Sequence, residues 1–136
     1  MASNNIKTVK KFYEMLMSGD PSKLPTVMDQ DIQLVMMKGW PYGGTYSGID
    51  SAINDFFSKV RELLDPFTLE IYEYIDAGDV VISLGMYHTP SKETGQDMPS
   101  AFAHLWDVRD GKLTRMRQYA DTVQISRALN HKVPEA

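Results

Sequence analysis

The feature that most constrains the fold is a pair of apolar and aromatic runs on either side of Asp110-Gly111, within the stretch from Ser100 to Leu129. Asp-Gly between such runs is the strongest short-range signal for a β-hairpin. The second run ends at Asp121, and Asp121-Thr122 can cap a helix through Ile125 to Leu129. Asp121 is therefore expected where a strand leaves the sheet, either as a plain helix cap or as an acid that leans over the sheet face.

Hydrophobic periodicity predicts the other regular elements. The predicted helices cover residues 6–17, 22–28 and 49–64, and the predicted strands cover 32–36, 67–76 and 80–88. Short turns join most of the strands, so neighbouring strands are expected to be antiparallel. This order of helices and strands predicts an α+β fold in which helices cover one face of a curved antiparallel sheet.

The stretch from Gly39 to Gly48 is expected to be a loop, because its glycines and proline disfavour regular structure. It carries Trp40, Tyr42 and Tyr46. Aromatic side chains on such a loop either plug the end of the core or line the mouth of a pocket.

Length and composition indicate one domain over residues 1–136, since 136 residues with 43% hydrophobic content can bury a core. The net charge is −4 and the positive side chains are scattered, so nucleic acid is not an expected partner. No apolar run is long enough to span a bilayer and the polar start Ala2–Asn5 is unlike a signal peptide, so no membrane partner and a cytoplasmic location are expected.

Several chemistries have no support in the sequence. The absence of cysteine excludes disulfides, thiolate catalysis and cysteine zinc sites. The three histidines lack the spacing of metal ligands, and no glycine-rich phosphate loop or serine nucleophile elbow occurs. We therefore expect no metal and no cofactor, which leaves general acid–base chemistry in a dry site.

Two histidines are candidates for distinct roles. His88 ends an apolar stripe with Leu84 and Met86, so it is either a rim histidine bonded to backbone or the base of a pocket. His104 shares a strand face with Phe102 and Trp106. If that face is the outer one, leaving it bare would expose an apolar patch, so we expect a symmetric homodimer that buries it.

The element order and four short segments resemble the ketosteroid isomerase and SnoaL-like polyketide cyclase branch of the nuclear-transport-factor-2-like superfamily. The segments are Leu16–Asp20, Gly44–Gly48, Ala77–Val81 and Asp110–Asp121, and the resemblance runs from Val9 to Leu129. It implies a sheet wrapped on helices into a cone with an apolar internal pocket, and a dimer formed through the outer sheet face.

The resemblance does not carry the steroid chemistry. The oxyanion-hole tyrosine of ketosteroid isomerase falls on Phe12, its aspartate base on Met36 and its protonated aspartate on Ala103, so all three roles are empty. Limonene epoxide hydrolase is similar at Asp121, but its arginine and second aspartate fall near Met86 and His88. The SnoaL-like cyclases use an aspartate with a histidine and polar helpers.

The resemblance therefore implies a site in which Asp121 is the acid or base, His88 its partner and Gln118 a hydrogen-bond donor to substrate. The same alignment places three sets of side chains in the pocket: Leu84, Met86 and His88; Ala101, Ala103 and Leu105; Met116, Gln118 and Ala120. The expected wall consists of Phe12, Met36, Trp40, Tyr46 and Phe57.

Our hypothesis is a cofactor-independent isomerase, cyclase or dehydratase acting on a small, mostly apolar polyketide-, terpenoid- or steroid-like molecule. The alternative is a non-catalytic ligand carrier or dimeric interaction module on the same fold. A pocket that holds Asp121 and His88 within reach of one another favours the enzyme. A pocket filled by Phe12, Met36 and Trp40 favours the alternative.

Overall fold

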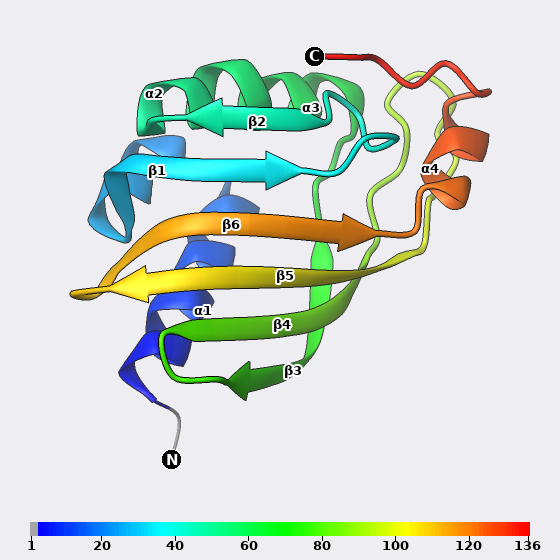
Figure 1. The fold of residues 1–136 in the computed structure, drawn as a ribbon. Coiled ribbons are helices and arrows are strands. Elements are labelled where there is room, and N and C mark those ends of the chain that lie inside the picture. The colour runs from blue at the N-terminus through cyan, green and yellow to red at the C-terminus, as the bar shows by residue number, and fades with distance from the viewer. Residues whose placement is uncertain (1–2) are drawn as a thin grey trace.

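The computed structural model describes residues 3–136 and contains a curved six-stranded sheet with the order β2–β1–β6–β5–β4–β3 (Figure 1). The strands are β1 Met28–Met36, β2 Gly44–Ser47, β3 Leu69–Asp76, β4 Val80–Tyr87, β5 Ser100–Arg109 and β6 Lys112–Ala120. Neighbouring strands are antiparallel except β1 and β6, which run parallel. The predicted α+β class with a curved sheet and N-terminal helices is confirmed.

Helices lie on one side of this sheet and at its ends (Figure 1). They are α1 Asn4–Ser18, η1 Pro21–Thr26, α2 Ile49–Ser51, η2 Ala52–Phe57, α3 Ser58–Leu63 and α4 Val123–Ala128. The Ser3 side chain caps α1 by accepting a hydrogen bond from the Ile6 N–H, and Gly19 ends it in the left-handed conformation. None of the helices within residues 3–136 is long and apolar enough to cross a membrane.

The predicted helix at 49–64 is present, as the consecutive segments α2, η2 and α3, of which η2 has π-helical hydrogen bonding. The predicted loop at Gly39–Gly48 is wrong in part, because its second half forms strand β2. Thr45 pairs with Val35 of β1, so the partner strand supplies the order that glycine-rich local sequence does not.

A β-bulge in the β5–β6 hairpin sets which side chains of β6 face the helices. Next to the Asp110-Gly111 turn, Val108 pairs with Leu113, but Asp107 pairs with Arg115, so Thr114 has no partner. Beyond the bulge, His104 pairs with Gln118. A hairpin without this extra residue would pair Ala103 with Gln118, because one residue of register moves each side chain to the opposite face.

The burial patterns of β4 and β5 correct the predicted faces of these strands. Phe102, His104 and Trp106 are buried under the helices, and the outer sheet face carries Leu84, Met86, His88, Ala101, Ala103 and Leu105. The prediction that Phe102, His104 and Trp106 form a subunit contact is therefore wrong, and so is the placement of Met86 and Ala103 in the pocket. The predicted inward direction of Met116 and Gln118 agrees with the structure.

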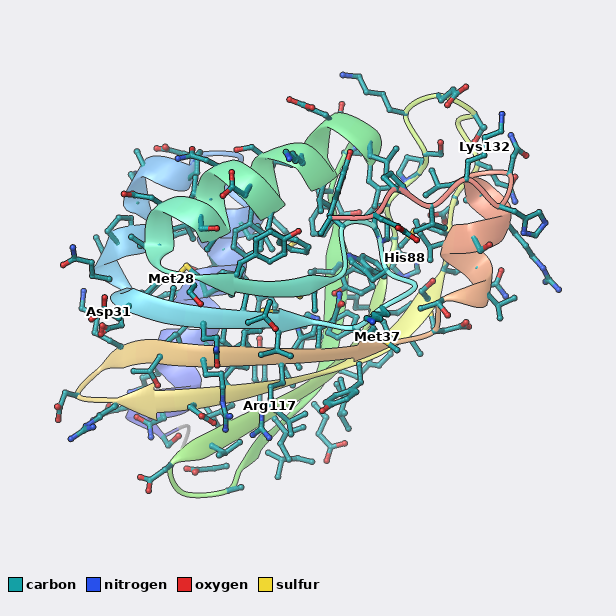
Figure 2. All side chains as sticks on the ribbon, turned by 45° about the horizontal axis from the view of Figure 1, so that its top comes forward. Met28, Asp31, Met37, His88, Arg117 and Lys132 are labelled. Carbon is teal, nitrogen blue, oxygen red and sulfur yellow. The ribbon has the colours of Figure 1, made fainter. Side chains whose placement is uncertain are left out.

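The outer sheet face combines apolar and charged side chains. Ile82, Leu84 and Leu105 stand on it beside an ion pair in which Arg115 Nε lies 2.7 Å from Asp107 Oδ2. Arg117 Nη2 lies 3.6 Å from the other carboxylate oxygen, and Figure 2 shows Arg117 on the side of the sheet away from α1.

Because residue 85 of β4 is glycine, the neighbouring strand β3 can lie close beside it in the sheet. A Cβ atom at this position would lie 2.1 Å from the Glu70 carbonyl oxygen and 2.8 Å from the Phe102 ring. The register of β3 against β4 shifts between Ile71 and Glu73, next to this contact. Because β3 carries Leu69, which lines the internal cavity described below, the small residue at 85 helps to set the width of that cavity.

We expect Gly85→Ala to destabilise the fold by at least about 2 kcal/mol, because backbone oxygen cannot move away as a flexible side chain can. Gly78→Ala is the matched control: Gly78 has a left-handed φ of 82° but no atom within 4 Å of its Cβ position. Backbone strain alone should lower the free energy of unfolding of Gly78→Ala by about 1 kcal/mol. Urea denaturation of both variants measures the difference, and an equal or smaller loss in Gly85→Ala would contradict this account.

Candidate functional site

An internal cavity lies between the inner sheet face, α1 and the helical segment η2. It is lined by Phe12, Leu16, Met36, Trp40, Phe56, Phe57, Phe67, Leu69, Tyr87, His104, Met116 and Gln118. Its free volume is about 20 Å³. That is room for about one water molecule. Side chains therefore nearly fill the cavity, which has aromatic walls and a polar end formed by Tyr87, His104 and Gln118.

His104 is the centre of the polar end. Its Nδ1 lies 2.6 Å from the Tyr13 hydroxyl and its Nε2 lies 2.7 Å from the Tyr87 hydroxyl. The ring also stacks on Phe102 with a centroid distance of 4.1 Å. Two tyrosines and a stacked ring thus hold the imidazole in one orientation, with both nitrogens engaged.

The Tyr13 hydroxyl also forms hydrogen bonds with two more buried groups. Ser83 Oγ lies 2.5 Å from the Tyr13 hydroxyl, and the Trp106 indole N–H donates to both oxygens over 3.2 Å. The tryptophan N–H can only donate. Among these contacts, the Ser83 hydroxyl can therefore donate only to the Tyr13 oxygen. Tyr13 then donates to His104 Nδ1.

By this direction we assign the proton of the neutral His104 ring to Nε2. With Nδ1 accepting from Tyr13, the ring proton is on Nε2 and is donated to the Tyr87 oxygen. The chain of hydrogen bonds therefore runs from Ser83 through Tyr13 and His104 to Tyr87, and its last proton is available at the cavity.

Gln118 leaves the polar end of the cavity incomplete. The side chain is 3% exposed, its Nε2 donates to the Tyr87 hydroxyl over 2.8 Å, and its Oε1 has no hydrogen-bond partner. Rotating the amide lets Oε1 accept the Tyr87 proton but leaves the NH₂ group without a partner. With Nε2 bonded to Tyr87, the cavity presents the Tyr87 proton and the unused acceptor Oε1, and in the rotated orientation it presents the unused NH₂ donor. A buried polar group without a partner costs about 1–3 kcal/mol.

Burial keeps the whole chain of hydrogen bonds neutral. Desolvation lowers the pKa of His104 to about 3. It also raises the pKa of Tyr87, against a smaller lowering by the Gln118 hydrogen bond. Burial raises the pKa of Tyr13 well above its ordinary value, although hydrogen bonds from Ser83 and Trp106 oppose the shift.

Most of the side chains expected to form the wall lie around this cavity. They are Phe12, Met36, Trp40, Phe57, Met116 and Gln118. Tyr46 is not among the lining residues: it packs against Phe56, and its hydroxyl donates to the Tyr42 carbonyl oxygen over 2.6 Å. The aromatic loop thus does both things considered for it, since Trp40 lines the cavity and Tyr46 covers the core beside it.

The predicted pair of His88 and Asp121 is not formed. The His88 side chain is 43% exposed on the outer face, with Nε2 at 3.7 Å from Glu70 Oε2. Asp121 is exposed and its Oδ1 accepts a hydrogen bond from the Val123 N–H over 2.9 Å, at the start of α4. The structure therefore supports the helix-cap interpretation of Asp121 and removes His88 from the pocket.

Sequence reasoning missed Tyr13, Ser83 and Tyr87 as parts of a site and left open whether His104 faces the pocket or a dimer contact. The available signal was the polar character of alternate positions on β4, where Ser83 and Tyr87 face inward and apolar residues face outward. In the part of the chain that the structure describes, no group of three or more potential metal ligands comes together.

We expect the stability of the fold to fall with acid because of His104. Histidine has an ordinary pKa of 6.5, so the unfolded chain binds a proton at a pH where folded His104 with a pKa of about 3 does not. The contribution of neutral His104 to the free energy of unfolding is complete above pH 6.5 and is lost as the pH falls towards 3. Between pH 7 and pH 5 the loss from this residue is about 2 kcal/mol.

Urea denaturation of the wild type and His104→Phe at both pH values measures this loss. The variant should lose about 2 kcal/mol less between pH 7 and pH 5 than the wild type. His88→Gln is the matched control and should keep the wild-type dependence, since His88 is exposed. The same pH dependence in His104→Phe and the wild type would contradict a neutral, buried His104.

Similar structures share this fold over nearly the whole chain. An NTF2-like protein from Burkholderia thailandensis E264 has 29% identity and a TM-score of 0.84, with 95% of this chain and 98% of that chain covered. TerC, co-crystallised with polyporic acid, has 30% identity and a TM-score of 0.85, with 94% and 99% covered. A protein from Jannaschia sp. CCS1, provisionally named a SnoaL-like polyketide cyclase, has 16% identity, a TM-score of 0.81 and coverage of 96% and 94%, and shows the fold alone.

No protein of curated function matches the chain significantly. The model of the SnoaL-like domain matches residues 9–116, which contain the cavity wall from Phe12 to Met116 and the centre of the hydrogen-bond chain. By this match, which covers more than half of its length, the chain belongs to the SnoaL-like domain family.

Proposed function

We propose that this protein binds a small, mostly apolar carbonyl compound with its oxygen at the polar end of the internal cavity, whose side-chain walls move to admit it, and catalyses a cofactor-independent proton transfer of the isomerase, cyclase or dehydratase type. The observation that carries the proposal is the buried chain of hydrogen bonds that ends on Tyr87 and Gln118 inside aromatic walls. A carbonyl oxygen is the ligand group that accepts the unused donor at this end of the cavity.

The residues would have separate roles in such a reaction. Tyr87 and Gln118 would donate hydrogen bonds to the substrate oxygen, and these bonds would strengthen as negative charge develops there in a water-excluded site. His104 would position Tyr87 and hold its hydroxyl proton ready, since Nε2 donates to the same oxygen. Tyr13, Ser83 and Trp106 would hold His104 in the required tautomer.

The lining narrows the class of substrate. Drawn from residues 3–136, it contains no Asp or Glu, and His104 is a weak base at a pKa of about 3. A substrate that this site can enolise therefore has C–H bonds already acidified by neighbouring carbonyl or aromatic groups, as polyketide-like molecules do. Names among the structural neighbours agree with this class: one was crystallised with polyporic acid and another is provisionally named a polyketide cyclase.

A non-catalytic ligand carrier is the second candidate. Both criteria set by the sequence favour it: His88 and Asp121 lie outside the cavity, and Phe12, Met36 and Trp40 line a cavity with about 20 Å³ of free volume and no carboxylate in its described lining. A carrier needs only the apolar walls and the polar end. The two candidates differ in one measurable respect, because a carrier binds the carbonyl compound without exchanging its α protons.

The test uses 2-tetralone, a small aromatic ketone with activated C–H bonds, as the probe. Quenching of tryptophan fluorescence reports binding, because Trp40 lines the cavity. Proton NMR in D₂O reports the exchange of α protons. We expect the wild type to bind the ketone and accelerate exchange, and Tyr87→Phe to lose about 100-fold or more of the acceleration while binding persists.

Asp121→Asn and His88→Gln are the matched controls and should keep both binding and exchange, because both side chains lie outside the cavity. Binding without any exchange in the wild type would favour the carrier. Polyporic acid is a second binding probe, taken from the complex of TerC. If neither probe binds, the cavity is not the ligand site.

We also propose that two copies associate through the outer sheet face, as the resemblance implied, but with different residues from those first expected. Leu84, Ile82 and Leu105 form its apolar part, and the pair of Asp107 and Arg115 gives it charges of both signs. A second copy related by a two-fold axis would present the same surface, which suits an isologous contact.

Leu84→Glu should convert a dimer to a monomer in light scattering at micromolar concentration, because a carboxylate would be buried without a partner in the contact. Met17→Glu is the control, since Met17 is 41% exposed on α1, on the other side of the sheet. A monomeric wild type, or a Leu84→Glu variant that remains dimeric, would show that this face is not the contact.

A further inference from the structure

Trp40 separates the internal cavity from a second, larger hollow. A cleft of about 390 Å³ is lined by Lys38, Gly39, Trp40, Gly43 and residues 133–136. Trp40 also lines the internal cavity of about 20 Å³. The cleft has the size of ligand sites in general, which measure about 300–1,000 Å³, whereas the internal cavity alone is far below that range. One side chain is thus the shared wall between a space that can hold a ligand and the polar end that can recognise it.

The Trp40 ring is placed by packing against the group that the proposed reaction uses. Its centroid lies 4.5 Å from that of Tyr87, with the planes tilted by 32°, and the side chain is 1% exposed. By contrast, Trp106 is fixed by hydrogen bonds to Tyr13 and Ser83. Rotation of the Trp40 ring therefore breaks aromatic contacts with Tyr87 but leaves the buried hydrogen-bond chain intact.

The backbone around Trp40 is held firmly. The Trp40 N–H donates to the Met37 carbonyl and the Gly43 N–H donates to the Trp40 carbonyl, over 3.3 and 2.9 Å. A Cβ atom on Gly43 would lie 2.2 Å from the Met37 oxygen, so the turn is tightly closed. The Tyr42 N–H donates to the Pro134 carbonyl over 2.8 Å, which ties the turn to the C-terminal segment seen beside it in Figure 1. A passage between the cleft and the internal cavity can therefore open by movement of the Trp40 side chain, without movement of its backbone.

Other walls of the cavity belong to the core. Phe12 packs on Trp106 with a centroid distance of 4.6 Å and on Phe57 with a distance of 5.9 Å, which joins α1 to the sheet and to η2. Moving either phenylalanine would separate a helix from the sheet. The Trp40 wall is the one that borders a cleft large enough for a ligand.

We infer that Trp40 is a gate and the residue that determines ligand length at this site, an inference that rests on the proposed function. When its ring rotates, the cavity and the cleft become one elongated space. The ligand that fits this space has a carbonyl-bearing aromatic end beside Tyr87 and Gln118 and extends past Trp40 into the cleft. Its far end lies next to Lys38 and Glu135, so polar groups are accepted there.

The gate is tested without a ligand by comparing Trp40→Ala with Trp40→Phe. The first removes the plug, while the second keeps an aromatic ring and is the matched control. The readout is exchange of the His104 ring N–H with solvent, followed by ¹⁵N NMR, because His104 lines the cavity behind Trp40. We expect exchange at least tenfold faster in Trp40→Ala than in Trp40→Phe. If Trp40→Ala does not fold, Trp40→Leu makes the same comparison, and equal rates would overturn the gate.

The elongated ligand is tested with two ketones, 2-tetralone and 6-phenyl-2-tetralone, on the wild type. The longer ketone should bind at least tenfold more tightly, because its phenyl group fills the cleft. Weaker binding of the longer ketone would overturn the length assignment. The two levels of inference fail differently: a difference in His104 N–H exchange without ketone binding keeps the gate and removes the proposed function. Ketone turnover with equal N–H exchange keeps the function and removes the gate.

Discussion

One unpaired residue in the β5–β6 hairpin, Thr114, decides which side chains of β6 face the cavity. With the bulge, His104 pairs with Gln118 and both face the helices. Without it, Ala103 would pair with Gln118, so with β5 unchanged Arg115 and Arg117 would face the helices and Met116 and Gln118 would face outward. The register of a sheet with two partly apolar faces is therefore as decisive for the chemistry as the identity of any side chain at the site.

The buried polar chain has a free-energy cost that the surrounding structure must offset. Tyr13, His104 and Tyr87 have lost their water, and each of them recovers hydrogen bonds only while the others keep their positions. The aromatic packing of Phe12 on Trp106 and of Phe102 on His104 supplies that rigidity. Apolar side chains would fill the same volume without this cost, which is why the polar chain is the basis of the proposed role in ligand recognition.

Neutrality is the property that links the stability of this site to its proposed chemistry. A pKa of about 3 keeps the His104 imidazole uncharged, so it can hold the Tyr87 hydroxyl without placing a charge in the cavity. Because the site is desolvated, a negative charge that develops on a substrate oxygen would be stabilised only by the few hydrogen-bond donors present. Under the proposed function, such a site suits substrates whose protons are already acidic, because neutral His104 is a weak base.

The sequence by itself determined the α+β class, most helices and strands, the hairpin turn at Asp110-Gly111 and six of the side chains around the cavity. These follow from periodicity and turn chemistry, which are local, and from the family resemblance. The faces of β4 and β5 were decided only by tertiary structure. Apolar residues such as Leu84 and Met86 made the outer face look like the inner one, and hydrophobicity alone could not identify the polar lining of Ser83 and Tyr87 as interior. Strand β2 and the neutral state of His104 likewise depend on pairing and burial by residues far away in the chain, and no local pattern encodes them.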